Sequence, residues 1–148
     1  GTRNGLSIRF NEEDVRPMGR TAKGVIGIRM ASDDEVVSAE MAEEKTALLT
    51  VSEKGIGKRS KIEDYPVQGR GGKGVISIKL TPKGGKAVGL MQVREEDELV
   101  IITSSGMVIR TNAGKISLHG RNTQGVRLID LAEEDRVVSI GKVLEKDD

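Results

Sequence analysis

Large aromatic side chains are nearly absent from this chain of 148 residues, which has one Phe, one Tyr and no Trp. Aromatic packing therefore cannot organise the interior, and Val, Ile, Leu and Met must fill it. The length is nevertheless ordinary for a single domain and is sufficient to bury a usable core.

Cysteine is missing altogether. Its absence excludes disulfides, thiolate nucleophiles and zinc–thiolate sites, and it fits a reducing compartment, so we expect a cytoplasmic protein. No stretch approaches the roughly 20 apolar residues of a membrane span, and no charged-then-apolar leader opens the chain. The sequence thus predicts no membrane partner and no export signal.

Proline is scarce at three residues, whereas glycine is abundant at 19. The apolar residues stand in short β-branched runs between glycines, a pattern that favours strands and tight turns over helices. The only helix-compatible stretch, residues 39–47, lies between two such runs, and we interpret it as a strand end followed by a linker.

The sequence repeats with a period of 50 to 51 residues. The segment GLSIRFNEEDVRPMGRTAKGVIGIRM, which begins at Gly5, aligns without a gap with GIGKRSKIEDYPVQGRGGKGVISIKL from Gly55. A third copy, GMVIRTNAGKISLHGRNTQGVRLIDL, begins at Gly106 after one extra spacer residue. All three copies contain an Arg four residues after the first glycine, then a Gly-Arg pair and a Gly-Val pair. Such a period indicates a repeat architecture.

Each repeat unit is predicted to contain four short strands. First strands are expected at 47–53 and 99–105, and the second strand follows the glycine, as at 56–60. Third strands are expected at 25–30, 75–80 and 126–131, and fourth strands at 36–41, 88–93 and 137–143. Four strands in a unit of this length are typical of a propeller blade.

Two kinds of connection join these strands. A long polar loop between the second and third strands contains one apolar residue, Val15, Tyr65 or Ile116, which we expect to anchor the loop to the core. A tight acidic or glycine turn joins the third and fourth strands at 32–35, 81–86 and 132–135.

The predicted fold class is all-β, with propeller-like blades of four antiparallel strands. We assign residues 1–148 to part of one domain, with units at 1–45, 46–97 and 98–148. The first unit lacks its first strand, so eleven strands are expected instead of twelve, and the chain is expected to begin within a blade. Three blades are too few for a closed propeller of the usual four to eight.

The formal net charge is only +1, but the charges are sorted along the chain. Residues 54–86 contain nine Lys or Arg residues against two acidic ones, whereas residues 33–44 contain six acidic residues and no basic one. Basic residues gather on the second strands and long loops, and acidic residues gather at turns and unit junctions. If the blades stack side by side, equivalent loops form a basic stripe.

A stripe of this kind suits the regular phosphate spacing of duplex DNA. Glycines beside the arginines let backbone N–H groups approach phosphate oxygens. Nothing indicates base reading, and two aromatic residues make a stacking platform for single strands an unfavourable interpretation. The candidate DNA-binding residues are the cations of these strands and loops: Arg9, Arg20, Lys23, Lys58, Arg59, Lys61, Arg70, Lys73, Arg110, Lys115 and Arg121.

Simpler interpretations compete at several positions. The repeated arginines could pair with the acidic turns instead of phosphate. The recurrent glycines at 19, 69 and 120, and at 24, 74 and 125, could serve positive φ angles in turns and at strand starts. The acidic run at 95–98 is most simply solvated surface.

No catalytic residue, metal site, cofactor or small-molecule substrate is predicted. The segment GRGGKG at 69–74 lacks the spacing of a P-loop and is not followed by a helical pattern. His119 stands where the other units have Met18 and Gln68, and no second His or Cys accompanies it. Tyr65 takes the same repeat position as Ile116, so we interpret it as a loop anchor and not as a nucleophile.

The stretches GKRSKIEDYPVQGRGGKGVISIKL, IITSSGMVIRT and ISLHGRNTQGVRLI closely resemble the last three blades of the C-terminal domain found in the A subunit of bacterial DNA gyrase. The resemblance spans essentially the whole chain. It implies a β-pinwheel, a six-bladed relative of the propeller in which neighbouring blades exchange strands. It also implies a non-catalytic module that wraps duplex DNA on a basic rim, within an ATP-dependent type II topoisomerase that introduces negative supercoils.

The partners implied by the resemblance are duplex DNA, the gyrase B subunit, and the remainder of the gyrase A subunit. In the family, the DNA-cleaving tyrosine and the ATPase belong to other domains, so Tyr65 is not expected to cleave DNA. The segment QGRGGKG at 68–74 is similar to the gyrase box of the family, Q-R-R-G-G-[KR]-G, with Gly69 in place of an Arg. We interpret it as a degenerate copy in which Arg70 and Lys73 contact phosphate.

Two alternatives stay open. One is the corresponding domain in the A subunit of topoisomerase IV, whose blades are fewer and more degenerate, although GRNTQGV and EDYP favour gyrase. The other is a propeller-like protein-interaction scaffold, suggested by the near-neutral net charge and the acidic faces.

Overall fold

The computed structural model of the chain describes residues 1–144. Its elements are β1 (Leu6–Ser7), η1 (Glu12–Asp14), β2 (Ala47–Ser52), β3 (Ile56–Lys61), η2 (Ile62–Asp64), β4 (Val75–Ile76), β5 (Ala87–Val93), β6 (Glu98–Thr103), β7 (Val108–Asn112), η3 (Ala113–Lys115), β8 (Val126–Arg127) and β9 (Val137–Lys142), where η denotes a single 3₁₀ turn. Every strand pairing is antiparallel, which confirms the all-β fold class.

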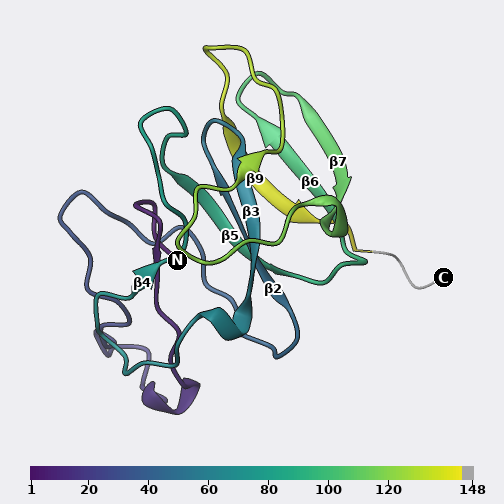
Figure 1. Cartoon of the computed structure of the whole chain (residues 1–148). Coiled ribbons are helices and arrows are strands. Elements are labelled where there is room, and N and C mark those ends of the chain that lie inside the picture. The colour runs from purple at the N-terminus through teal and green to yellow at the C-terminus, as the bar shows by residue number, and fades with distance from the viewer. Residues whose placement is uncertain (145–148) are drawn as a thin grey trace.

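Two of the sheets are blades (Figure 1). The first has the strand order β5-β2-β3-β8 and is called blade 2, and the second has the order β7-β6-β9 and is called blade 3. In each, the first strand of the unit is central, because it pairs with the second strand through a hairpin and with the fourth strand on its other side. All six residues of β2 are accordingly buried.

Neighbouring units exchange a strand, as the resemblance implies. The third strand of unit 3, β8, pairs with the second strand of unit 2, so that Gly57 lies opposite Val126. In the same way β4 of unit 2 pairs with β1 of unit 1, with Ser7 opposite Val75. Each unit therefore completes the edge of the unit before it.

Aliphatic side chains fill the core, as the shortage of aromatic residues predicts. The larger cluster lies between blades 2 and 3 and includes Leu49, Val51, Leu99, Ile101 and Val137. These side chains alternate along the central strands, which places one face of each sheet against its neighbour.

The predicted anchors Tyr65 and Ile116 are 3% and 4% exposed, so two of the three anchor predictions are confirmed. Val15 is 42% exposed, and that prediction is wrong. Tyr65 packs on Leu48 and Leu90 of blade 2, whereas unit 1 offers no such sheet beside Val15 among residues 1–144.

Several predicted strands differ from the structure. The third strands expected at 75–80 and 126–131 are only two residues long, because the backbone then turns: the amide of Ser77 donates to the carbonyl of Gly5, and the amide of Leu128 donates to that of Gly55. The expected strands at 25–30 and 36–41 do not form. Residues 36–41 have no central strand of unit 1 beside them among residues 1–144, and they pair with the start of the chain through an isolated bridge between Thr2 and Val36 and hydrogen bonds between Gly1 and residues 37–38.

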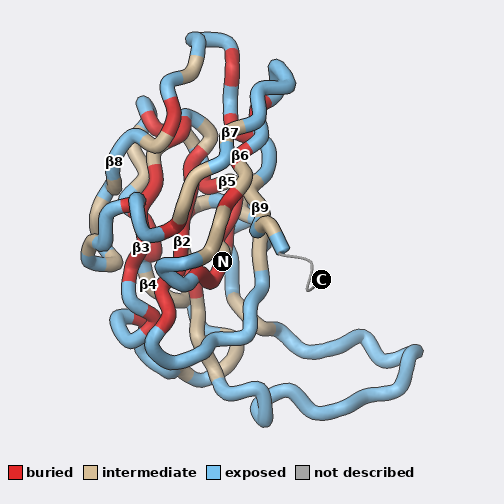
Figure 2. Tube along the Cα trace, turned by 90° about the vertical axis from the view of Figure 1, so that its right-hand side faces the viewer, coloured by how far each residue is buried: buried red, intermediate tan, exposed pale blue. Residues whose placement is uncertain are grey.

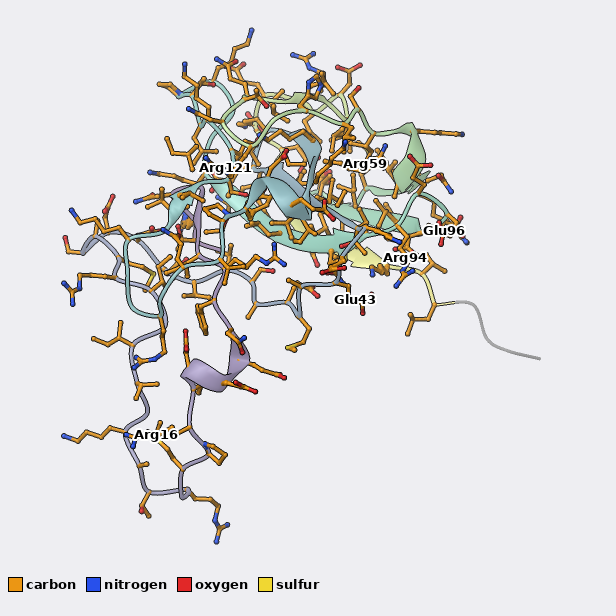
Figure 3. The ribbon with its side chains drawn as sticks, turned by 60° about the horizontal axis from the view of Figure 1, so that its bottom comes forward. Arg16, Glu43, Arg59, Arg94, Glu96 and Arg121 are labelled. Atoms are coloured by element: carbon orange, nitrogen blue, oxygen red, sulfur yellow. The ribbon has the colours of Figure 1, made fainter. Side chains whose placement is uncertain are left out.

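The part of unit 1 that lacks strands is largely open to solvent. Residues 11–26 are all exposed, and the long pale blue loop in Figure 2 contrasts with the buried strands of blades 2 and 3. Arg16, labelled in Figure 3, lies on this loop, far from the blades. The unit boundaries stay a prediction, and residues 145–148 of unit 3 lie outside the described residues.

Candidate functional site

The long loops between the second and third strands dock on the preceding unit. In unit 2, the amide of Gln68 donates to the carbonyl of Arg9 (2.7 Å), and that of Gly71 donates to the carbonyl of Gly27 (2.7 Å). In unit 3, the backbone amide of His119 donates to the carbonyl of Arg59 at 2.8 Å. Equivalent loops therefore occupy equivalent places on successive units, as a stripe of repeated side chains requires.

Arg70 and Arg121, the arginines of the Gly-Arg pairs, hold these loops in place. Arg70 donates from Nε to the carbonyl of Asp14 (3.1 Å) and from Nη1 to that of Ile26 (2.6 Å). Arg121 repeats the pattern one unit later, with the carbonyls of Asp64 (3.1 Å) and Ile76 (2.7 Å). Both guanidinium groups stay partly exposed, and their Nη2 atoms have no hydrogen-bond partner within residues 1–144.

The arginines of the second strands face the following unit. Arg59 is 6% exposed, and its Nε donates to the carbonyl of Ile116 at 2.7 Å. Arg9 reaches the carbonyls of Ile62 and Tyr65 at 3.3 Å each. These two candidates therefore link one unit to the 3₁₀ turn of the next, and their charged groups are occupied by backbone oxygens.

Arg110, at the same repeat position in unit 3, has no following turn among residues 1–144. It is exposed and forms a bidentate pair with Glu98, at 2.8 Å and 2.6 Å. This pair raises the pKa of Arg110 and lowers that of Glu98.

Lys58 is the most unexpected of the candidates. Its side chain is completely buried, at 0% exposure. Burial, with the nearby Arg121 adding to it and Asp64 opposing it, lowers the pKa of Lys58 to about 8. Lys58 is therefore inside the protein and does not belong to the exposed stripe.

Besides Arg110, five candidates are exposed at the second-strand ends and on the long loops: Arg20, Lys23, Lys61, Lys73 and Lys115. Lys23 and Lys73 occupy the same repeat position, directly before the glycine that opens the third strand. The structure thus divides the eleven candidates into three groups. Six are exposed, Arg9, Arg70 and Arg121 are half-buried, and Lys58 and Arg59 are both buried.

Sequence reasoning missed further cations in the segments where third strands were expected. Arg29 and Lys79 occupy one repeat position and are both exposed, and Arg127 is exposed on β8. The alternation of the third strand, in which Ile28 and Ile78 face inward, is the sequence signal that could have identified the first two. Arg127 is partly neutralised by Asp130 at 2.9 Å.

The acidic turns bind the turn between the first and second strands of their own unit and not the repeated arginines. Oδ1 of Asp135 accepts from the amides of Ser105 (3.0 Å) and Arg136 (2.9 Å), and Oδ2 accepts from Oγ of Ser105 (2.6 Å). Asp34 accepts from the amides of Asn4 and Glu35 at the equivalent place in unit 1. The carboxylates of the acidic turns therefore do not compete with phosphate for the candidate arginines.

These hydrogen bonds hold the pKa of Asp135 well below its usual range, the Ser105 hydroxyl contributing most. A carboxyl with a lowered folded-state pKa stabilises the fold above its ordinary pKa of about 4, and the contribution is lost as the pH falls through the lower value. We expect Asp135→Asn to lower the melting temperature at pH 7, and the difference from wild type to shrink progressively below pH 4.

Thermal melts from pH 2 to pH 7 measure this effect. Glu134→Gln is the matched control, since it removes one exposed carboxylate from the same turn. A difference between Asp135→Asn and wild type that does not vary with pH would contradict the assignment.

Tyr65 and His119, the two side chains considered above for catalysis or metal binding, lie in places where they serve the fold. The hydroxyl of Tyr65 is 2.9 Å from Oγ of Ser77 in the interior, and burial raises its pKa. His119 lies in a docked loop, and within residues 1–144 no three His, Cys, Asp or Glu side chains gather into a possible metal site.

Among the residues that the structure describes, none forms a helix of the length and hydropathy that a membrane crossing requires.

Strand-exchanging antiparallel blades, with cation-bearing loops at equivalent places, define a repeat protein of the propeller class. The sequence matches the family described as the DNA gyrase C-terminal domain, beta-propeller, over residues 1–43, 46–94 and 97–143. The chain belongs to this family.

Relatives and solved structures agree with this assignment. The chain is 48% identical to the DNA gyrase A subunit of Salmonella typhimurium over 141 residues, which cover 95% of this chain and 16% of that protein. It is 45% identical to the DNA gyrase A subunit of Deinococcus deserti, over 99% of this chain and 19% of that protein. The chain thus spans less than a fifth of these curated relatives.

Two solved structures have the same fold. A DNA gyrase A C-terminal domain matches with a TM-score of 0.89 and 33% identity, over 97% of this chain and 49% of the solved one. The C-terminal domain of a DNA topoisomerase IV also gives a TM-score of 0.89, over 96% of this chain and 45% of the solved one, but at 24% identity it supports the fold alone. The gyrase interpretation is therefore favoured over topoisomerase IV.

Proposed function

We propose that this chain is a non-catalytic, duplex-DNA-binding part of the A subunit of a DNA gyrase, and that it contributes a stretch of the path on which DNA is wrapped to support negative supercoiling. The observation that supports this most directly is the equivalent placement of Arg70 and Arg121. Each guanidinium is fixed on the preceding unit through Nε and Nη1, with Nη2 left for a phosphate oxygen.

Rigid placement matters because a restrained guanidinium loses little side-chain entropy when it binds a phosphate. The exposed Lys23 and Lys73 lie three residues after the arginine of their own loops and add a second charge at the same repeat interval. Contacts of this kind recognise the backbone of DNA and not its bases.

The relatives' names support the wider context. We propose that the chain acts with the gyrase B subunit, and with the remainder of the gyrase A subunit, in the bacterial cytoplasm. Cleavage and ATP hydrolysis belong, in this proposal, to those other parts. The small share of the relatives' length that the chain spans fits a module of a larger enzyme.

Duplex binding is tested by fluorescence anisotropy with two labelled duplexes of unrelated sequence over a range of salt concentrations. We expect similar affinities for both duplexes and a steep linear fall of log K with log salt. The double variant Lys23→Gln/Lys73→Gln should reduce the slope by about 2, since each lost phosphate contact removes about one.

The control is Lys83→Gln/Arg136→Gln, which removes two exposed cations near the tight turns. Its slope should match that of the wild type. An equal reduction of the salt slope in both double variants would indicate electrostatic attraction of DNA to the whole surface and not to the long loops. Binding that is insensitive to salt would contradict the proposal. Wrapping is measured on the same variants, as a change in the linking number of a circular plasmid relaxed in their presence.

A further inference from the structure

Lys58 lies where the other units have Ile8 and Ile109 on their second strands. Its ammonium donates to the carbonyl of Gly120 (2.7 Å), to the carbonyl of Arg121 and to Oγ1 of Thr123 (3.0 Å). An ammonium has three donors, and all three are therefore used on one loop of the following unit.

The preceding interface shows the contrasting arrangement. There, Ile8 faces the loop of unit 2, and a Cβ added at Gly72 would lie 3.6 Å from its Cδ1. Gly72 corresponds to Thr123 in the repeat. An apolar side chain thus faces glycine at one interface, whereas a cation faces a hydroxyl and two carbonyls at the other.

The two loops also differ in composition. Residues 69–74 include four glycines, with Gly71 at φ +82°, whereas residues 120–125 include two. Glycine enlarges the conformational freedom of a loop. The loop with fewer glycines is thus the one that has charge-assisted hydrogen bonds to a buried side chain, which are stronger than neutral ones.

We propose that Lys58 is a positioning residue that fixes the loop at 120–124, and with it the guanidinium of Arg121, as a preformed phosphate-binding element on unit 3. The loop of unit 2 has no buried cation behind it and is held by Arg70 and by backbone hydrogen bonds, such as that from the amide of Gly71 to the carbonyl of Gly27. This inference rests on the proposed DNA-binding function.

The side chain and the backbone of Arg121 are held by different groups. Its guanidinium is held by the carbonyls of Asp64 and Ile76, while its own carbonyl accepts from Lys58. Lys58 thus fixes the backbone of the residue whose side chain faces the DNA, and it does so from the interior without touching DNA itself.

The test is a double-mutant cycle with Lys58→Ile and Arg121→Gln, read as duplex affinity and salt slope. Isoleucine is the residue of the other two units at this position, so the strand should tolerate it. Each single variant is expected to bind several-fold more weakly and to lose about 1 from the salt slope. The double variant should bind no more weakly than Arg121→Gln alone, because both changes remove the same contact.

Amide hydrogen exchange supplies a readout that does not depend on DNA. In Lys58→Ile we expect faster exchange at the amide of Lys79, which donates to the loop carbonyl of Thr123 at 2.9 Å, and unchanged exchange along β2, with Lys83→Gln as the single-charge control. Independent, additive losses in the cycle, or wild-type affinity in Lys58→Ile, would overturn the role of Lys58, as would unchanged exchange at the Lys79 amide. Wild-type protein that fails to bind duplex DNA would overturn the proposed function instead, and the exchange data would still decide whether Lys58 fixes the loop.

Discussion

Gly125→Ala is expected to lower the free energy of unfolding by about 3–5 kcal/mol, which combines backbone strain with overpacking. Gly125 has φ +85°, and an added Cβ would lie 2.5 Å from the carbonyl oxygen of Gly57. That oxygen belongs to the backbone of β3, so no side-chain rotation can relieve the contact. The substitution must separate β8 from β3 and open the exchange between units 2 and 3.

Gly24→Ala is a matched control for this prediction. Gly24 takes the same repeat position and has φ +81°, but nothing lies within 4 Å of an added Cβ. It should lose only the strain of a left-handed alanine, about 1–2 kcal/mol. Gly74→Ala, whose Cβ would clash with the carbonyl oxygen of Ser7, should behave like Gly125→Ala.

Urea denaturation of the three variants measures these differences. Equal destabilisation of Gly24→Ala and Gly125→Ala would show that φ alone determines the glycine. A larger loss at 74 and 125 would show that close approach of the exchanged strand adds to it, and that is the result we expect.

The sequence interpretation of these glycines was partly right. Glycines 24, 74 and 125 do have positive φ, as the turn argument predicts. Glycines 19, 69 and 120 do not, and nothing in the structure explains their recurrence. Recurrence reveals that a position is constrained, but the nature of the constraint depends on atoms from another unit.

Strand prediction succeeded where a strand has its partners within the chain. The first strands, β2 and β6, form almost as predicted because each is central in its sheet. Residues 36–41 have the same alternating composition and form no strand, since backbone pairing is a property of neighbours and not of the segment itself.

The candidate site was predictable as a region and not as a set of contacts. Repeat position and charge located the loops that dock on the preceding unit, and they identified exposed cations such as Lys23 and Lys73. The two interpretations weighed for the arginines were phosphate and acidic turns, whereas Arg9, Arg59, Arg70 and Arg121 all bind backbone carbonyls. Every residue has a carbonyl, so no sequence pattern marks those acceptors.

Arg59→Met is expected to lower the free energy of unfolding by about 2–3 kcal/mol, because it leaves a buried carbonyl without its donor. The Nε of Arg59 is 2.7 Å from the oxygen of Ile116, and Nη1 is 3.8 Å from the exposed Glu95, a distance at which the ion pair adds little. Methionine keeps an unbranched apolar stem, so the loss reports the guanidinium.

The control is Arg110→Met, the same repeat position in an exposed setting, where the pair with Glu98 is open to solvent. Its unfolding midpoint should change little, because exposed ion pairs contribute weakly.

Duplex binding distinguishes a recurrent arginine that contacts phosphate from one that stabilises the fold. A residue that contacts phosphate would lower the salt slope by about 1 when removed, and Arg59→Met, measured well below its melting temperature, should leave that slope unchanged. A reduced slope with unchanged stability would instead assign Arg59 to the DNA surface and would require the link between blade 2 and η3 to open in solution.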